Sequence, residues 1–273
     1  MKKVSFLFVG FDKSGSTWLH KNLVSHPQVY VPKEKDLYFF DRYFSRGLKW
    51  YHSFFQEGFN NSEIKAIGEL SHDYIYSYDA AKRIKEYNPD IKIIITFRNS
   101  IERYLSLLNF SVMKGSITKF QAKSVDRHPE ITSRAIVTSY IKKYIELFDE
   151  KNILLLDFDD LKSNPKSFLK TFYQFIDVED FFDKDLINKK INKTKSHRFF
   201  LFNWVVFRIG LFARLLGLNS LIALVRRNKI IQKILYKEDD QDKLKLDDIN
   251  HEFIVKLNED YQSLINLKNH YNE

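Results

Sequence analysis

The chain has 273 residues, of which 44% are hydrophobic and 29% are charged, a composition typical of a globular protein with a substantial core. It contains no Cys, which excludes disulfides, thiol nucleophiles, zinc–thiolate sites and iron–sulfur clusters and favours a reducing compartment. The net charge of +9 favours anionic partners, and the excess lies between Leu186 and Lys237, where twelve Lys or Arg and no acidic residue occur.

Four apolar runs predict buried strands, and they alternate with segments of helical periodicity. The predicted strands cover residues 3–10, 64–69, 91–97 and 152–158. The predicted helices cover residues 16–25, 47–56, 78–87, 100–114, 132–149, 165–176, 200–217, 220–235 and 250–270. This alternation indicates an α/β fold of three layers with a mostly parallel central sheet. We expect residues 1–185 to form this core and residues 186–273, with helices but no strands, to form a helical C-terminal extension of the same domain.

The sequence GFDKSGSTWL, from Gly10 to Leu19, follows the first predicted strand and opens the first predicted helix. Such a turn directs backbone N–H groups and the positive end of a helix dipole at one point, as a P-loop-like fold does to bind phosphate. Lys13 adds a mobile cation there. In a triphosphate-binding loop a Lys stands directly after the second Gly, whereas here Ser16 follows Gly15. The segment therefore predicts phosphate binding and disfavours triphosphate hydrolysis.

A second candidate phosphate site follows the third predicted strand, in the sequence RNSIERYLS from Arg98 to Ser106. Arg98 stands at the end of this strand, where α/β sheets bind ligands. If a helix begins near Ser100, then Arg103 and Ser106 lie one turn apart on the same face. Arg98 and Ser106 are therefore predicted to bind a second phosphate through a charge-assisted and a hydroxyl hydrogen bond.

In these two segments the chain resembles the sulfotransferase family, whose sulfuryl donor is 3′-phosphoadenosine-5′-phosphosulfate (PAPS). The sequence KSGSTWL, which begins at Lys13, is similar to the family's 5′-phosphosulfate loop. Residues 98–106 are similar to its 3′-phosphate element, R-x-P-x-x-R-x-x-S, with Ser100 in place of the usual Pro. The resemblance implies a P-loop-like sulfotransferase fold.

Three further segments are similar to glycan O-sulfotransferases of the heparan 3-O type and their bacterial relatives. Residues 35–41, KDLYFFD, resemble the segment K-E-x-H-F-F-D of those enzymes. Residues 68–71, GELS, together with Tyr74 resemble G-E-x-[ST]-P-x-Y, and residues 192–195, NKTK, resemble a loop that covers the nucleotide. The matches run in the family's order across most of residues 1–200, which favours a glycan or glycolipid hydroxyl as acceptor.

The resemblance implies in-line transfer, in which an acceptor hydroxyl attacks sulfur and adenosine 3′,5′-bisphosphate (PAP) leaves. Lys13 is implied as the catalytic cation that stabilises the charge growing on the leaving phosphate oxygen. No metal is expected, because Lys and Arg can hold the phosphates. The donor-binding residues implied are Lys13, Ser14, Gly15, Ser16, Thr17, Trp18, Arg98, Ser106, Lys195 and Arg198.

A base must accept the hydroxyl proton, and the family's catalytic Glu falls on Asp36. Because Asp is one methylene shorter than Glu, His72 and Glu34 remain alternatives, with Asp36 the first choice. Leu70 is a second departure, since the glycan 3-O enzymes carry Lys at that position. This departure puts the transfer of their detailed acceptor chemistry in doubt.

Two other functions remain open at this stage. A nucleotide or small-molecule kinase would use the same scaffold but is disfavoured by Ser16, and a non-catalytic binder of nucleotide or anionic glycan would lack a usable base. The apolar and basic residues 199–233 are interpreted as a helical lid, or alternatively as a segment that contacts an anionic membrane surface. The first residues read as a strand rather than a signal peptide, so a cytoplasmic location is expected, which becomes peripheral at the inner membrane face if residues 199–233 contact the membrane.

Overall fold

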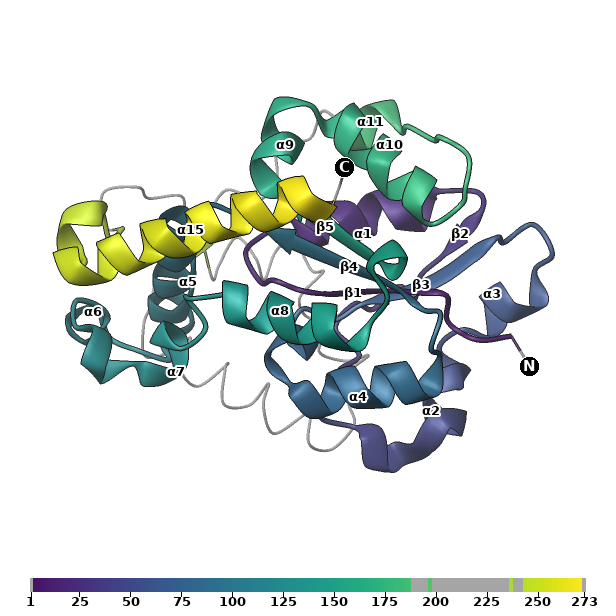
Figure 1. The fold of residues 1–273 in the computed structure, drawn as a ribbon, viewed down its shortest axis with the longest axis horizontal. Coiled ribbons are helices and arrows are strands. Elements are labelled where there is room, and N and C mark those ends of the chain that lie inside the picture. The colour runs from purple at the N-terminus through teal and green to yellow at the C-terminus, as the bar shows by residue number, and fades with distance from the viewer. Residues whose placement is uncertain (1, 188–195, 198–235, 238–242, 272–273) are drawn as a thin grey trace. The chain divides into compact units, whose positions relative to one another are not determined.

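The computed structural model describes residues 2–187, 196–197, 236–237 and 243–271. Its centre is a five-stranded sheet in the order β2-β3-β1-β4-β5, in which every neighbouring pair is parallel (Figure 1). The strands are β1 (Phe6–Gly10), β2 (Val29–Tyr30), β3 (Ala66–Leu70), β4 (Lys92–Phe97) and β5 (Ile153–Asp157). The predicted α/β fold with a parallel central sheet is therefore confirmed, and of the five strands in this sheet only the two-residue β2 has no counterpart among the predicted strands.

Helices cover both faces of the sheet, because alternate side chains of each strand point to opposite sides. On one face Phe6, Phe8 and Ile94 pack with residues of α1 and α10, and on the other Leu7 and Ile93 pack with residues of α4 and α8. Figure 1 shows α1, α9, α10 and α11 on the first side and α2, α4 and α8 on the second. Strands buried on both faces explain why the sequence shows continuous apolar runs rather than alternation.

Most of the long predicted helices are confirmed to within one residue. These are α1 (Ser16–Ser25), α4 (Tyr78–Tyr87), α5 (Ser100–Lys114), α10 (Pro165–Phe175) and α15 (His251–Tyr271). The other described helices are α2 (Gly47–Ser53), α3 (Gln56–Asn60), α6 (Lys119–Ala122), α7 (Pro129–Thr132), α8 (Thr138–Leu147), α9 (Phe158–Ser163) and α11 (Lys184–Ile187). Single 3₁₀ turns lie at Phe44–Arg46, Tyr74–Tyr76, Val125–Arg127, Glu150–Asn152 and Leu246–Asp248.

Two helix predictions were wrong at their boundaries, and the structure gives the reason in each case. The helix expected at 47–56 is interrupted between α2 and α3, where Phe55 leaves helical geometry and is fully buried. The helix expected at 132–149 begins only at Thr138. Its first amides, those of Val137 and Thr138, donate to the buried carboxylate of Asp260, 3.1 and 2.9 Å away.

Contacts divide the chain into two compact units. The first comprises Met1–Ser100, Ile136–Ile191 and Asn258–Glu273, and it contains the whole parallel sheet. The second comprises Ile101–Ala135 and Asn192–Leu257. Within the second unit, Tyr104 packs against Phe253 with ring centroids 5.0 Å apart, and Asn109 exchanges hydrogen bonds with the backbone of Leu244.

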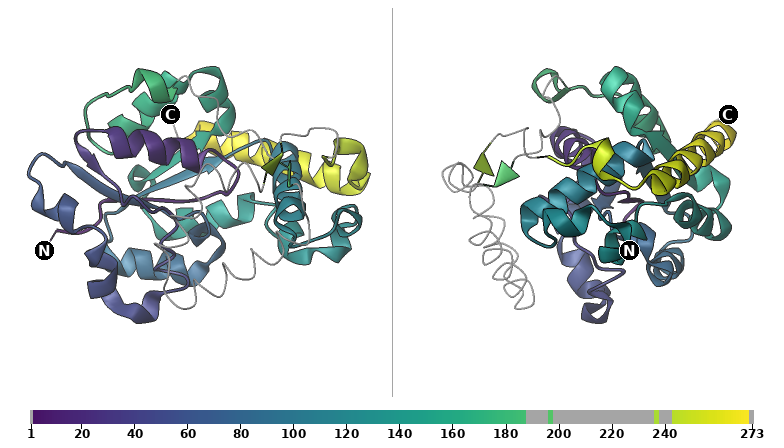
Figure 2. Two further views of the ribbon diagram at one scale, coloured as in Figure 1. Left: turned by 180° about the vertical axis from the view of Figure 1, so that it is seen from behind. Right: turned by 90° about the vertical axis from the view of Figure 1, so that its left-hand side faces the viewer.

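The segment after residue 185 was predicted to have no strands, and the structure corrects this. Ser196–His197 (β6) and Tyr236–Lys237 (β7) form an antiparallel pair, visible as two short arrows in Figure 2. Strands of two residues are too short to give a periodicity signal. The predicted helices at 200–217 and 220–235, and the segment 199–233 considered for membrane contact, lie outside the described residues.

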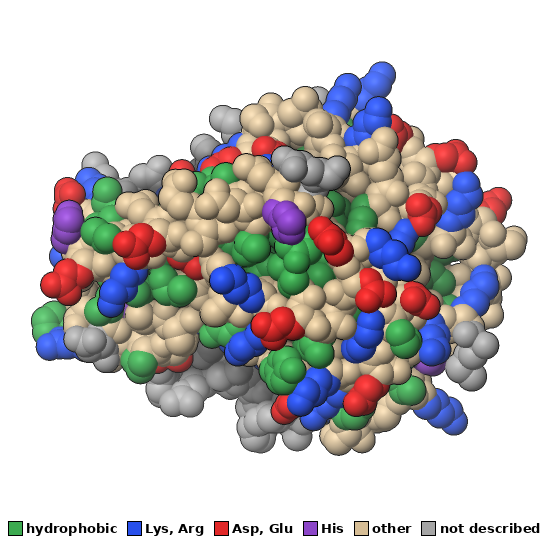
Figure 3. All heavy atoms as spheres, viewed as in Figure 1, with side chains coloured by type: hydrophobic (Ala, Val, Ile, Leu, Met, Phe, Trp, Pro, Cys, Tyr) green, Lys and Arg blue, Asp and Glu red, His purple; other side chains and the backbone are tan. Residues whose placement is uncertain are grey.

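Charges of both signs are interspersed on the face drawn in Figure 3, without a large area of either one. This agrees with the sequence, in which the basic excess is confined to Leu186–Lys237.

Asp260→Ala is expected to lower the free energy of unfolding by about 1–3 kcal/mol or more, because it leaves buried donors of Ser100, Val137 and Thr138 without their acceptor. Urea unfolding measures the change. Glu259→Ala, at the exposed neighbouring position of the same helix, is the control and should change stability by less than about 0.5 kcal/mol. Equal effects of the two substitutions would contradict the role of Asp260.

Candidate functional site

The predicted phosphate loop joins β1 to α1 and has the backbone geometry that anion binding requires. Lys13 and Gly15 have φ values of 61° and 87°, and α1 begins at Ser16 with its first turn closed onto the carbonyl of Gly15. A Cβ atom at Gly15 would lie 2.9 Å from Leu161 and 3.0 Å from Phe158, so no larger residue fits without displacement. The amides at the start of α1 have no carbonyl four residues earlier in the helix, which leaves them able to bind an anion.

Three other residues of the segment from Gly10 to Leu19 differ in their burial. Ser14 is buried, and its carbonyl accepts a hydrogen bond of 3.0 Å from the Thr96 hydroxyl on β4. Trp18 is also buried, with its ring packed edge-on against Phe168 of α10, so its side chain belongs to the core. Thr17, between Ser16 and Trp18, is partly exposed.

Lys13 and Arg98 lie near each other at the same edge of the sheet. The pKa of Lys13 is lowered to about 8: burial makes the largest contribution, the neighbouring cations Arg98 and Lys35 add to it, and Asp12 opposes it. The Arg98 guanidinium lies 4.9 Å from the ring centroid of Phe158, the same ring that closes on Gly15. Two cations brought together by the ends of β1 and β4 form the electrostatic environment in which a bound anion is stabilised.

The other residues that the sequence predicted to bind PAPS lie in different parts of the chain. Ser106 lies on α5 in the second compact unit, partly exposed. In the same unit the fully buried Arg103 donates to the carbonyls of Arg134 and Ala135, so it holds the segment that follows α7. Lys195 and Arg198 lie outside the described residues.

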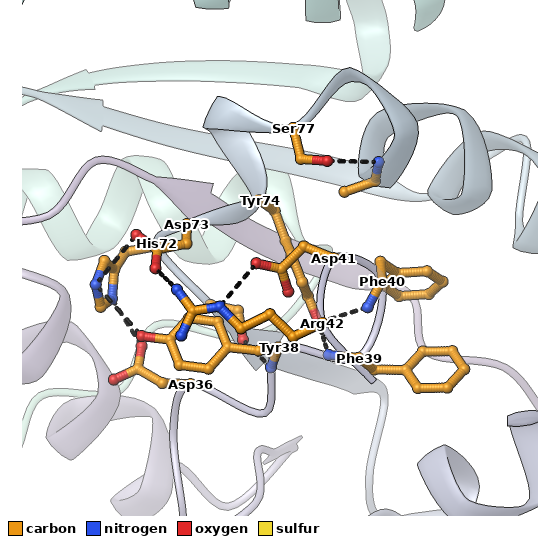
Figure 4. A network of polar contacts seen from close by, with 12 residues as sticks. Asp36, Tyr38, Phe39, Phe40, Asp41, Arg42, His72, Asp73, Tyr74 and Ser77 are labelled. Carbon is orange, nitrogen blue, oxygen red and sulfur yellow. Dashed lines mark hydrogen bonds and ion pairs between the residues drawn. The ribbon is translucent and has the colours of Figure 1, made fainter. Parts of the chain in front are cut away.

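Asp36 and His72, which the sequence presented as alternatives, form one pair (Figure 4). His72 follows β3, and its Nδ1 lies 2.8 Å from Oδ1 of Asp36. Burial works against the charge on each group, but their mutual attraction prevails. It raises the pKa of His72 above its ordinary value and, together with Lys35, holds the pKa of Asp36 well below its usual range. On the far side of the ring, Nε2 lies 3.4 Å from the Tyr38 hydroxyl and 3.7 Å from a carboxylate oxygen of Asp73.

The third candidate base, Glu34, has a different environment. It is partly exposed, and its charge acts on His20 and Tyr30.

Lys35 connects the phosphate loop to this pair, a role that the sequence analysis missed. Its Nζ donates to the Ser16 hydroxyl at 3.0 Å and lies 3.4 Å from Oδ2 of Asp36. The signals available in the sequence were its position directly before Asp36 and its match to the first residue of the segment K-E-x-H-F-F-D.

A buried carboxylate beneath the pair fixes the segment that carries Asp36. Glu69 accepts hydrogen bonds from the hydroxyls of Tyr51 (2.7 Å), Tyr74 (2.8 Å) and Ser71. Two of these hydroxyls accept in turn from backbone amides: Ser71 from Tyr38, and Tyr74 from Phe39 and Phe40 (Figure 4). Asp36 and Tyr38 have φ values of 65° and 54°, a region that non-glycine residues rarely adopt, so these bonds maintain a strained backbone.

Comparison with known proteins identifies the family. The model of the sulfotransferase domain matches residues 4–205, which is most of the chain. The chain belongs to the sulfotransferase domain family. Among the described residues of this sulfotransferase-family chain, no cluster of three or more His, Asp or Glu has the arrangement of a metal site. No helix in the described part is both long and apolar enough to cross a membrane.

The family's relatives match this chain in part. It is 32% identical over 108 residues to the membrane-associated sulfotransferase kil1 of Dictyostelium discoideum, covering 40% of this chain and 23% of that protein. It is 33% identical over 100 residues to human heparan sulfate glucosamine 3-O-sulfotransferase 6, covering 37% and 28%. The match thus spans less than a third of these curated relatives. A sulfotransferase structure from Alicyclobacillus acidocaldarius shares the fold, with a TM-score of 0.60 and 21% identity over 84% of this chain and 98% of that one.

The titration of Glu69 is expected to appear in the stability of the protein. Burial raises its pKa to about 7, so the folded chain keeps a proton that the unfolded carboxyl loses near pH 4.3. The free energy of unfolding should therefore fall by roughly 3 kcal/mol from this group between about pH 4.5 and 7. Glu69→Gln cannot ionise and should remove this decline in urea unfolding at a series of pH values. Glu63→Gln, at an exposed position, should leave the decline in place, and an unchanged decline in Glu69→Gln would refute the assignment.

Proposed function

We propose that this chain transfers a sulfuryl group from PAPS to a hydroxyl of a glycan or glycolipid. One observation carries the proposal: a phosphate loop and a pair of groups able to accept a proton are connected. The loop has the cations Lys13 and Arg98 near it. Lys35 contacts both Ser16 of the loop and Asp36, which pairs with His72. Membership of the sulfotransferase domain family supports PAPS as the donor of the sulfuryl group.

The donor would bind with its 5′-phosphosulfate in the loop and its 3′-phosphate at the start of α5. Backbone amides of Gly15, Ser16 and Thr17, with the positive end of α1, would hold the 5′-phosphate. Arg98 and Ser106 would hold the 3′-phosphate, while Lys195 and Arg198 are proposed to close over the nucleotide. Because Lys13 is mostly desolvated and repelled by Arg98, a phosphate anion would restore its full charge on binding.

The transfer forms one bond to sulfur and breaks another. The acceptor oxygen attacks sulfur, and the electron pair of the breaking S–O bond leaves on the 5′-phosphate oxygen of PAP. Lys13 would stabilise that growing charge, an interaction stronger in the transition state than in the ground state. The acceptor's proton must be removed on the opposite side of the sulfur.

The Asp36–His72 pair is proposed as the base. Asp36 accepts a hydrogen bond from Nδ1–H of His72. In the neutral ring this bond favours the tautomer in which Nε2 is unprotonated and can accept a proton. The raised pKa of His72 makes it the stronger base of the two near neutral pH, since the pKa of Asp36 is held low. In this assignment Nε2 takes the proton and Asp36 stabilises the imidazolium that forms.

The acceptor class is supported by relatives rather than by a contact in the structure. Two groups of relatives are named for heparan sulfate: the glucosamine 3-O-sulfotransferase and the bifunctional N-deacetylase/N-sulfotransferases. The segment from Lys35 to Asp41 is similar to that of the 3-O type in sequence, which favours a sugar hydroxyl over an amine. A screen of hydroxyl-bearing and amine-bearing saccharides and glycolipids with labelled PAPS tests this choice.

Donor preference is tested by thermal stabilisation. PAP at about 100 times its Kd is expected to stabilise the folded chain by about 2.7 kcal/mol, whereas ATP with Mg²⁺ at the same concentration should stabilise it much less. Arg98→Ala should reduce the shift by PAP, while Arg127→Ala, on the short turn of the second unit, serves as a control for the loss of an Arg. Greater stabilisation by ATP with Mg²⁺ would instead favour a kinase.

The pH dependence of transfer identifies the base. Because His72 accepts the proton only when neutral, the rate should rise with pH through a pKa above 6.5. His72→Gln should lower kcat by about 100-fold or more. Asp36→Asn removes the charge that raises the pKa of His72. The pH at which the remaining activity of this variant rises should therefore be lower than in the wild type. Wild-type kcat in His72→Gln, together with its loss in Asp36→Asn, would show that Asp36 takes the proton directly.

A further inference from the structure

We propose that Lys35 is a catalytic residue that contacts the sulfuryl group during transfer and stabilises the negative charge on its oxygens. The inference rests on the proposed function and adds to it a second cation, at the sulfur rather than at the leaving phosphate.

The position of Lys35 is the first argument. Its Nζ donates to the hydroxyl of Ser16, the first residue of α1, at 3.0 Å. It also lies 3.4 Å from Asp36, which pairs with His72 at 2.8 Å. One ammonium group thus touches both the loop proposed to hold the leaving phosphate and the pair proposed to deprotonate the acceptor. In an in-line reaction the sulfur lies between these two partners.

The electrostatics of Lys35 are the second argument. Its charge contributes to lowering the pKa of Lys13, so the two ammonium groups repel each other across the site. A sulfuryl group between them would turn this repulsion into attraction for its oxygens. The Lys35 side chain is 23% exposed, so it is partly shielded from water, and its attraction for an anion is stronger there than at a fully exposed position. An ammonium has three N–H donors, so its contacts with Ser16 and Asp36 leave one for a sulfuryl oxygen.

The third argument comes from the backbone beside Lys35. The amide of Asp36 donates to the carbonyl of the buried Leu70, the last residue of β3, at 2.8 Å. This bond fixes the segment with Lys35 against the end of β3, two residues before His72.

The alternative is that Lys35 only forms an ion pair with Asp36, which does not explain its contact with Ser16. At 3.4 Å and partly exposed, such a pair contributes little stability by itself. The shorter contact is the one to Ser16, which an ion pair with Asp36 does not require.

The test separates binding of the nucleotide from transfer of the sulfuryl group. Lys35→Met removes the charge and keeps most of the side-chain volume. Lys33→Met, two residues earlier and exposed, is the matched control. For each variant, titration calorimetry gives the Kd of PAP, which has no sulfuryl group. Release of labelled sulfate from PAPS gives the rate of transfer to water, which needs no knowledge of the natural acceptor.

Lys35→Met is expected to lower the maximal rate of transfer about 100-fold while the Kd of PAP changes less than twofold. Lys35→Arg, which keeps the charge, should recover a large part of the rate, and Lys33→Met should match the wild type. If Lys35→Met does not fold, Lys35→Gln provides the same comparison with a polar side chain.

Three results would overturn the inference. A maximal rate in Lys35→Met within threefold of the wild type means that Lys35 does not contact the sulfuryl group. A loss of PAP affinity as large as the loss of rate, reproduced by Ser16→Ala, means that Lys35 only holds the phosphate loop. A wild-type chain that neither binds PAP nor cleaves PAPS contradicts the proposed function itself, and is thereby distinguishable from failure of the Lys35 assignment alone.

Discussion

The geometry of the site depends on a single buried carboxylate. Glu69 accepts three hydroxyl hydrogen bonds, and two of those hydroxyls hold the amides of residues 38–40. The segment with Asp36 therefore keeps a backbone conformation that its residues would not adopt alone. A carboxylate in the core is costly, and its raised pKa records that cost. The molecule sacrifices some stability to hold a catalytic candidate in place, as enzymes commonly do.

The parallel sheet determines which groups can meet at this edge. Strands β1, β3 and β4 are neighbours, so the residues that follow them share one side of the molecule. Lys13 follows β1, His72 follows β3 and Arg98 follows β4. Lys35 and Asp36 arrive from the connection between β2 and β3, held to β3 by the amide of Asp36. The result is a group of cations beside an acid–imidazole pair, in which Arg98 and Lys35 contribute to lowering the pKa of Lys13 and Asp36 raises the pKa of His72.

Much of this arrangement could be predicted from the sequence, because its signals are local. Continuous apolar runs marked β1, β3, β4 and β5, and the glycine and serine turn after β1 marked the phosphate loop. The pairing of Asp36 with His72 could not be predicted, since it depends on a backbone contact between segments about 35 residues apart. The start of α8 was missed for a similar reason: its N-terminal amides are satisfied by Asp260, more than 120 residues later. Lys35 was overlooked because nothing in the sequence shows that its side chain reaches α1.

The hydrogen bonds of Asp260 also bear on how the protein is made. This carboxylate on α15 joins Ser100, at the start of α5, to the start of α8, across 160 and 123 residues of sequence. During synthesis the five strands of the parallel sheet all precede α15 in the chain. The sheet can therefore begin to assemble before α15 is made, but the start of α8 and the turn after Arg98 acquire this support only once Asp260 has been synthesised. Contacts of such long range slow folding, so this edge of the sheet stays open to non-native contacts for longer than the strands themselves.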